Sequence, residues 1–457
     1  MKTTCDLTSV LRGGGVNPLR KRQAFRERRP DVKGVGFLTG ALRLFALAAT
    51  CLLVHGAWAA QFQPTTGGNL DDPDNWNSTS DTTYGVVKQQ SAALTISSAS
   101  ATLPNNGSLL YRTNVHTNDF GAGNTLTVAG LTVEEGATLV HKSGTIDSTE
   151  AATFNNGAAV FTGTGSVLKG TSATLSNGGS LAIEDGAAWN FTRSVTINSG
   201  TKVVADGATL SMNTPSSGTS YYITVNEGGT FAVKDSTVNL ANGKAHIAIN
   251  NATATFDEVA ISMGASNGSS IGGDGGTVLF AGGTSTINHR FPMTGDDFTF
   301  CVSNATVNFT PSTASELFIT GSGAATEELA KTLRFCGSAR LAVASSGGLH
   351  LRGTKGVKLQ FDLDANSAPD SPMVEITNAS GEFKGDATCL AASQIVVNID
   401  AHTAPGTYTL LKGKNAATFL TGESKWTTNS DRAVISAKGN DEVVVTVKPT
   451  GLVIIFR

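Results

Sequence analysis

The chain has 457 residues, of which 52 are glycine, while aromatic residues make up 7% and charged residues 15%. Hydrophobic residues make up 40%, which is too many for a disordered chain, and the small side chains are too numerous for a conventional enzyme core. This composition is typical of long all-β repeat proteins.

The N-terminal segment has the three parts of a secretory signal. A basic stretch (RKRQAFRERRPDVKG, residues 20–34) precedes a short apolar run (LFALAATCLLV, residues 44–54), and small residues follow at Ala57 and Ala59. We therefore expect residues 1–59 to be a signal peptide that the export machinery reads, with cleavage near Ala59 and a secreted or cell-surface product. The alternative is a retained N-terminal anchor, although the apolar run is short for a membrane span.

Cleavage after Ala59 would change both charge and cysteine count. The segment 1–59 contains 10 of the 33 basic and 3 of the 36 acidic residues, so the remaining chain carries 23 against 33 and a net charge of −10. This sign argues against a nucleic-acid partner. Cys301, Cys336 and Cys389 remain, an odd number for a disulfide framework, so we expect buried free thiols, with one disulfide as the alternative.

Residues 60–84 are expected to form an N-terminal cap. The stretch DDPDN places Asp71, Asp72 and Asp74 close together, and oxygen-rich loops can bind Ca²⁺. Because the spacing of known calcium loops is missing, a polar turn is the preferred interpretation and calcium the weaker one. Trp76 is expected to cover the end of the apolar interior.

Residues 85–300 contain a repeated pattern in which an apolar lead-in, a polar pair and a glycine precede a strand with alternating apolar residues. The marker glycines recur at nearly regular intervals: Gly136, Gly157, Gly178, Gly200 and Gly228. A period of about 20 residues predicts a solenoid, and alternation such as Leu181 and Ile183 against Ala182 and Glu184 predicts strands. The fold class is therefore all-β, a right-handed parallel β-helix with N- and C-terminal caps.

The repeat also predicts dimensions and the place of one aromatic residue. At about 22 residues per coil the chain would form about 16 coils, in a rod of about 75–80 Å. Trp189 is expected to be a platform or end residue on a coil.

Residues 301–457 are less regular and are expected to form further coils and a C-terminal β cap. Residues 325–335 (ATEELAKTLRF) are the one helix-like stretch and are expected to form one short helix or a bulging loop. Alternation of Val443, Val445 and Val447 predicts a strand with one buried face. The final LVIIF (residues 452–456) is either a closing strand or a short sorting tag.

These patterns resemble a known group of surface proteins. Three features are similar to autotransporter-type passenger domains and related bacterial β-helix surface proteins. They are the repeated order of NG turns, short strands and DGA closures, the segment GGNLDDPDNWN at 67–77, and the segment PGTYTLLKG at 405–413. The resemblance covers residues 65 to 450 and implies a β-helix displayed outside the cell. No series of ten-residue alternating strands follows, as an outer-membrane barrel domain would need.

Many β-helix proteins cleave polysaccharides, so the acidic and basic side chains of this chain are candidates for catalysis. Asp296 and Asp297 in TGDDF resemble the paired carboxylates of polygalacturonase-like enzymes, whose companion motifs are missing. His350, Arg352 and Lys355 could bind an acidic sugar, or belong to a solvated strand face. We therefore expect no catalytic activity and no cofactor, and an adhesin-like or structural protein whose partner is an unknown surface glycan or protein. The alternative is a carbohydrate-active lyase or hydrolase acting on acidic glycans.

Overall fold

The computed structural model describes residues 60–63, 68–87, 93–213, 220–242, 244–263, 270–288, 292–294, 297–311, 317–320, 329–420 and 426–449. These residues belong to one compact unit, Trp58–Arg457. The expected signal peptide, Asp296 and the LVIIF tail lie outside the described residues.

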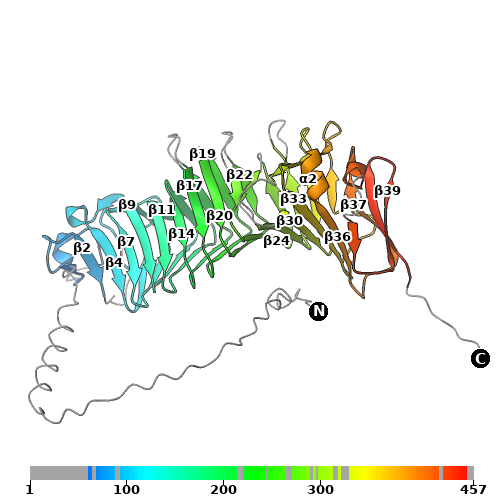
Figure 1. The fold of residues 1–457 in the computed structure, drawn as a ribbon. Helices are drawn as coiled ribbons and strands as arrows, with labels where there is room; N and C mark the ends of the chain where they lie inside the picture. Colours follow the sequence, from blue (N-terminus) through cyan, green and yellow to red (C-terminus); the bar gives the residue numbers. More distant parts are fainter. Residues whose placement is uncertain are drawn as a thin grey trace, which may run out of the picture. The chain divides into compact units, whose positions relative to one another are not determined.

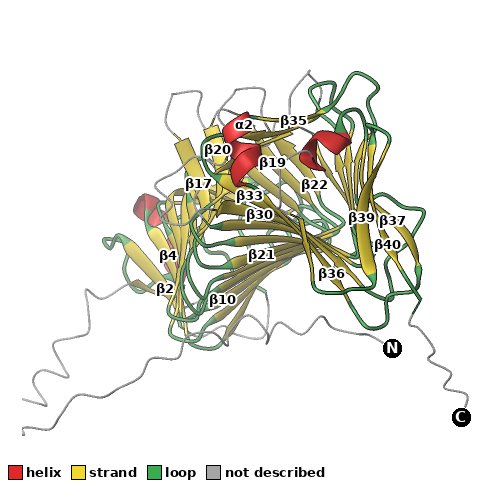
Figure 2. Ribbon diagram, turned by 45° about the vertical axis from the view of Figure 1, so that its right-hand side comes forward, coloured by secondary structure: helices red, strands yellow, loops and turns green. Residues whose placement is uncertain are grey.

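The unit is a parallel β-solenoid of about 11 turns, and 59% of its described residues lie in strands and 5% in helices. The predicted all-β parallel solenoid is therefore confirmed, while the right-handed sense and the two caps stay predictions. Strands of successive turns lie side by side along the coil (Figure 1), and three stacks of strands enclose the interior (Figure 2).

One stack is a 13-stranded sheet, in which each strand pairs in parallel with the next along the solenoid. Its strands are β5 (Val115–Asn118), β8 (Thr138–His141), β10 (Ala158–Thr162), β12 (Ser180–Glu184), β15 (Lys202–Asp206), β18 (Thr230–Lys234), β21 (Thr253–Asp257), β24 (Thr277–Ala281), β27 (Phe298–Ser303), β30 (Leu329–Cys336), β33 (Gly356–Leu363), β36 (Gln394–Ile399) and β38 (Trp426–Thr428).

The other two stacks are joined in a 27-stranded sheet, because the long strands β9 (Gly144–Asn155) and β11 (Ser166–Ser176) belong to both. One stack contains β1 (Ala60–Gln61), β2 (Thr83–Val86), β4 (Ser108–Arg112), β7 (Leu131–Glu134), β14 (Val195–Ile197), β17 (Ser220–Val225), β20 (Lys244–Ile249), β23 (Ser270–Gly272), β26 (Pro292–Thr294), β29 (Leu317–Thr320), β32 (Leu349–Arg352) and β35 (Phe383–Gly385). The other contains β3 (Ser100–Thr102), β6 (Thr125–Val128), β13 (Ala188–Phe191), β16 (Thr209–Asn213), β19 (Thr237–Asn242), β22 (Ala260–Met263), β25 (Thr284–Ile287), β28 (Thr306–Phe309), β31 (Arg340–Val343), β34 (Val374–Ile376) and β37 (Gly406–Lys412).

The predicted number of about 16 coils is wrong because the turns differ in length. Thr138 pairs with Ala158 on the next turn, whereas Lys358 pairs with Gln394, a much longer step along the chain. The early repeats follow the predicted period, whereas the later turns contain longer corners. The same length of chain therefore makes fewer turns.

Alternate residues of each strand fill the interior, as expected for period-two strands. Leu181 and Ile183 are buried, whereas Ala182 and Glu184 are half-buried on the outer side. Trp189 differs from its prediction: it is fully buried in the interior and its ring lies parallel to that of Phe231, with centroids 6.4 Å apart. A tryptophan at an inward position of β13 contributes more to the stability of the fold by burying its ring than it would by covering the end of a coil.

Corners between strands use residues with positive φ. Four of the five marker glycines have positive φ, for example Gly136 at 76°. Gly157 is the exception, since its φ is not positive, but a Cβ atom at this position would lie 2.5 Å from the carbonyl oxygen of Val133. Its neighbour Asn156 takes the positive φ, at 54°. Glycine is therefore needed at these corners for two different reasons.

The first described residues already belong to the solenoid. β1 pairs in parallel with β2, so the segment 60–84 contributes strand residues to the coil. Trp76 is buried between Phe62 and Tyr84, with ring centroids 5.0 and 4.9 Å away, and its indole N–H donates to Leu70 O at 2.9 Å. Trp76 is thus packed among apolar residues, while its expected role of covering the end of the interior stays a prediction.

The short helix or bulging loop expected at residues 325–335 is wrong for the described part, because residues 329–336 form the strand β30. Leu333 and Phe335 face inward and the strand pairs with β27 and β33, so tertiary pairing overrides the local helical preference. A short helix that the sequence did not predict, α2 (Ala387–Ala392), lies before β36.

Pairing becomes antiparallel at the C-terminal end. β40 (Glu442–Val447) lies between β37 and β39 (Ala433–Lys438) and runs antiparallel to both. Val443, Val445 and Val447 are buried, as the alternation predicts, and Val444 is buried too.

Candidate functional site

Five threonines in register form a ladder on the outer face of the 27-stranded sheet. Each lies opposite the next on adjacent strands β7, β9, β11, β14 and β17, and we call this the first threonine ladder: Thr132, Thr153, Thr174, Thr196 and Thr224. All five side chains are exposed or half-buried. Adjacent strands are about 4.8 Å apart, so the ladder repeats a hydroxyl and a methyl group at that spacing.

A second threonine ladder lies on the outer face of the 13-stranded sheet. It follows β18, β21, β24, β27 and β30, again with each residue opposite the next: Thr230, Thr253, Thr277, Thr299 and Thr332. Thr230 and Thr253 are exposed, and the other three are half-buried. The solenoid thus presents the same uncharged group on five successive turns.

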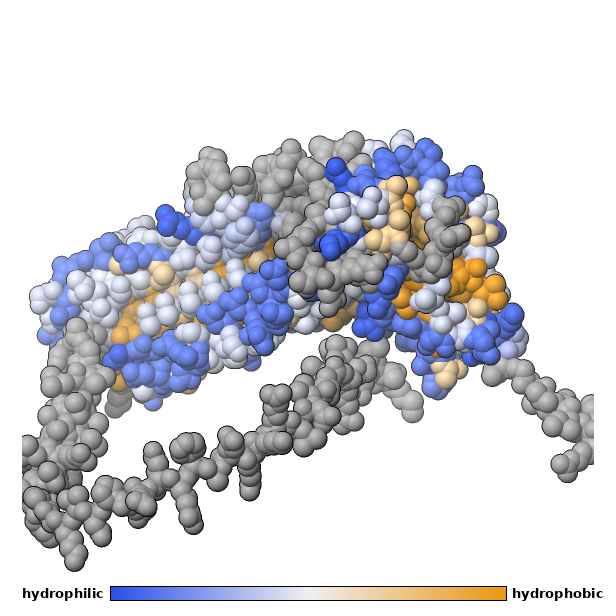
Figure 3. Space-filling view, viewed as in Figure 1, coloured by the Kyte–Doolittle hydropathy of each residue, from blue (hydrophilic) through white to orange (hydrophobic). Residues whose placement is uncertain are grey.

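A row of aliphatic side chains lies two positions along the same outer face, on the earlier turns. Its members are opposite one another on β8 to β18 and are partly exposed: Val140, Val160, Ala182, Val204 and Ala232. In the space-filling view, apolar residues form a band along the solenoid with hydrophilic residues on its borders (Figure 3). An uncharged surface with hydroxyl, methyl and aliphatic groups can hydrogen bond weakly and bury apolar area at each turn.

Two of the three predicted sugar-binding cations meet around a carboxylate that the sequence did not single out. His350 Nε2 lies 3.2 Å from Asp386 Oδ1, and the backbone N–H of Gly353 donates to Asp386 Oδ2 at 3.0 Å. The Gly353 N–H, the His350 ring and the charge of Arg352 hold the pKa of Asp386 below its usual range. The anion that these groups stabilise is therefore the protein's own carboxylate. Lys355 lies in the following corner and is half-buried.

Asp297 does not meet these residues. It is exposed and has a φ of 53° at the corner before β27, while Lys355 lies at the corresponding corner before β33, two turns further along. Two turns correspond to about 10 Å between strands. Asp297 and the residues around His350 therefore lie along the same corner of the coil, but they do not form an acid–base pair.

The acidic residues of the first turn accept hydrogen bonds from the protein itself. Asp71 accepts from both the backbone N–H and the hydroxyl of Ser97 on the next turn. Asp72 accepts from Asp74 N at 3.0 Å and caps the short 3₁₀ helix Pro73–Asn75. In the part of the chain that the structure describes, no group of three His, Cys, Asp or Glu side chains is placed to hold a metal ion. Calcium binding stays a prediction without a ligand set.

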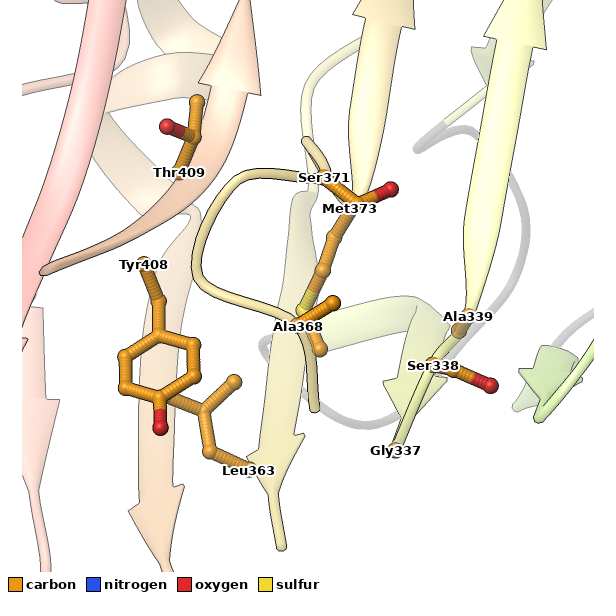
Figure 4. A pocket seen from close by; sticks show the side chains of 9 residues that line it. All are labelled: Gly337, Ser338, Ala339, Leu363, Ala368, Ser371, Met373, Tyr408 and Thr409. Atoms are coloured by element: carbon orange, nitrogen blue, oxygen red, sulfur yellow. The ribbon is translucent and has the colours of Figure 1, made fainter. Parts of the chain in front are cut away.

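A small cavity lies near the C-terminal end, where the corner at Gly337–Ala339 faces the loop before β34 (Figure 4). Leu363, Met373 and Tyr408 line one side, and the Tyr408 hydroxyl donates to Ala404 O at 2.7 Å. The cavity volume of about 30 Å³ is the space of one water molecule. A sugar ring would not fit inside it.

The three described cysteines are free and buried, as expected for small buried thiols. None of the helices among the described residues is long and apolar enough to cross a membrane.

Comparison with known proteins found no match: no protein-family model, no curated protein and no solved structure is significantly similar to this chain.

Sequence reasoning missed the threonine ladders and Asp386 for different reasons. The ladder residues recur once per turn, so a signal existed in the repeat, but unequal turn lengths hide which threonines are opposite each other. Asp386 lies far from His350 along the chain and precedes a helix that no sequence pattern predicted.

Proposed function

We propose that this chain is an exported β-solenoid that works at the cell surface or outside the cell, as an adhesin-like or structural module related to autotransporter passenger domains. The tripartite N-terminal segment supports export. The observation that carries the adhesive role is the second threonine ladder, whose uncharged groups repeat on five successive turns.

A repeated surface of this kind suits an extended polymer. Each threonine offers one hydroxyl and one methyl group, so a polysaccharide chain lying along the solenoid could make a similar weak contact at every turn. Contacts within one chain add as a multivalent interaction, which gives useful binding from weak units. The net charge of −10 after cleavage at Ala59 (23 basic against 33 acidic residues) disfavours polyanions, so we favour a neutral glycan.

The test is binding of the full chain to insoluble neutral polysaccharides, with pectin as the acidic comparison. We expect Thr253→Lys with Thr277→Lys to abolish retention, because two bulky cations would interrupt the second ladder. The matched control is Thr153→Lys with Thr174→Lys on the first ladder, which should retain binding. Equal retention by all variants would show that the second ladder is not the adhesive surface.

Export is tested separately by intact-mass measurement of secreted protein. We expect the mass to correspond to the loss of residues 1–59, since the small residues at Ala57 and Ala59 suit signal peptidase. Secreted protein that retains residues 20–29 would contradict the proposal.

The alternative function, a carbohydrate-active enzyme, depends on the contact between His350 and Asp386. If this pair worked as acid and base on an acidic glycan, incubation with pectin would release new reducing or unsaturated ends, and Asp386→Asn would stop the release. We expect no release from the unmodified chain.

A further inference from the structure

One strand at the C-terminal end of the coil has a free edge. β39 pairs with β40 on one side, and among the described residues no strand pairs with its other side. Figure 1 shows β39 at this end of the coil, beyond β37. The N–H and C=O groups along an unpaired edge lack partners, so such an edge readily pairs with a further strand. The edge of β39 can therefore accept a segment in extended conformation.

The register shows which backbone groups point to that edge. Lys448 N donates to Arg432 O at 2.9 Å, and this bond continues the antiparallel ladder between β39 and β40. Alternate residues of an antiparallel strand are hydrogen-bonded to one given neighbour. Counted in steps of two from Arg432, Ser436 is bonded to β40. The N–H and C=O groups of Ile435 and Ala437 therefore point to the free edge.

The apolar cover at this end of the coil is incomplete. Trp426, Ala433 and Ile435 pack against the apolar core but are only partly buried. On the other face of β39, Val434 is 44% exposed. In the space-filling view, apolar residues are exposed at this end of the coil (Figure 3). Burying such side chains is favourable, so the edge favours an apolar occupant.

The chain itself supplies a segment of suitable length and composition. Residues 450–457 read TGLVIIFR, and their apolar part, residues 452–456, is one residue shorter than β39. Lys448 lies beside Arg432, just before the start of β39. The far edge of β39 is two strand spacings, about 10 Å, from β40. Four residue steps after Lys448 span up to about 13–14 Å, which is enough to reach it.

We propose that residues 452–456 dock along the free edge of β39 as an added strand. The chain turns at Thr450 and Gly451, where glycine permits the backbone to reverse, and then runs parallel to β39. Alternate apolar side chains of the docked segment cover Ile435 and Trp426, and its backbone pairs with the free groups of β39. The edge is then closed to other chains. This docking is independent of the adhesive role proposed above.

The test is residue-resolved hydrogen exchange in the full chain and in a variant that lacks residues 450–457. We expect the amides of Ile435 and Ala437 to exchange at least about tenfold faster in the variant, because their hydrogen bonds to the docked segment are lost. The amide of Ser436 is the internal control, since its partner is β40, and its exchange should change by less than about twofold. Circular dichroism checks that both proteins are folded.

Two point variants of the full chain keep the test independent of the truncation. Ile454→Pro should speed exchange at Ile435 and Ala437 as the truncation does, because proline cannot donate a hydrogen bond to the ladder and fits poorly in a paired strand. Arg457→Ala lies outside the docked segment and is the matched control, which should keep the protection of the parent.

Three results would overturn the proposal. The first is rapid exchange of Ile435 and Ala437 in the unmodified chain, which would mean that the edge is empty. The second is unchanged exchange after removal of residues 450–457, which would leave LVIIF as a sorting tag. The third is protection that disappears on dilution together with a dimer in sedimentation measurements, which would assign the edge to a second copy of the chain.

Discussion

The side-chain amide of Asn226 donates to Asn198 Oδ1 at 3.0 Å across one turn of the solenoid. Asn250 donates to Asn226 Oδ1 at 3.3 Å on the next turn, and Asn198 donates to Leu175 O at 2.9 Å on the previous one. These bonds form a continuous amide ladder at one corner, in which each asparagine satisfies the polar group of its neighbour.

We expect Asn226→Ala to destabilise the solenoid by about 1–3 kcal/mol, because it leaves the Asn198 oxygen and the Asn250 amide without their partners. The measurement is urea unfolding followed by circular dichroism. Asn190→Ala, on an outer strand position of β13, is the control and should change stability by less than about 0.5 kcal/mol. A loss as large in the control would show that the ladder has no special contribution.

Two glycines at equivalent corners should respond differently to alanine. At Gly157 a Cβ atom would lie 2.5 Å from Val133 O, a backbone atom that cannot easily move, whereas at Gly136 nothing lies within 4 Å. Gly136 has a φ of 76°, so Gly136→Ala should cost about 1–2 kcal/mol through backbone strain alone. Gly157→Ala should cost about 3 kcal/mol or lose soluble protein, as forced overpacking does. Thermal unfolding of the two variants side by side checks the order, which the reverse ranking would contradict.

Stability should fall in mild acid because of one buried histidine. Burial lowers the pKa of His141 from 6.5 to about 4, while its Nε2 lies 2.8 Å from Gly144 O. The unfolded chain takes up a proton as the pH falls below 6.5, whereas the folded chain resists until about 4. The contribution of His141 to the free energy of unfolding is therefore fully present above pH 6.5, where the ring is neutral in both states. This contribution falls by about 3 kcal/mol between pH 6.5 and pH 4.

The pH effect is isolated by comparing urea unfolding at pH 7.5 and pH 5 in the parent and in His141→Leu. We expect the leucine variant to lose part of the pH dependence, and His402→Gln, at an exposed position, to keep all of it. An unchanged dependence in His141→Leu would assign the acid sensitivity to carboxylates instead.

Trp189 should tolerate a smaller aromatic ring better than alanine. Its ring is fully buried against Phe191, with centroids 5.5 Å apart, and its indole N–H has no hydrogen-bond partner among the described residues. Trp189→Phe removes that unpaired group and leaves a small void, so we expect a loss below about 1.5 kcal/mol. Trp189→Ala should cost about 3–5 kcal/mol. Chemical unfolding measures both, and similar losses would mean that the indole itself is needed.

The sequence by itself determined the all-β solenoid, because its signals are local. Alternation along a strand, glycine or asparagine at each corner and a period of about 20 residues are all readable within one or two repeats. For the same reason the inward positions of Leu181 and Ile183 could be predicted before any partner strand was known.

Only the tertiary structure decided which residues meet across turns. The register between two strands depends on the summed lengths of all the corners between them, and the corner lengths vary from turn to turn. The spacing of threonines along the sequence therefore does not show which of them lie opposite each other. The same holds for His350 and Asp386, which lie on neighbouring turns but far apart along the chain. Residues 329–336 became a strand because β27 and β33 supply hydrogen bonds on both sides, and a single sequence cannot display such partners.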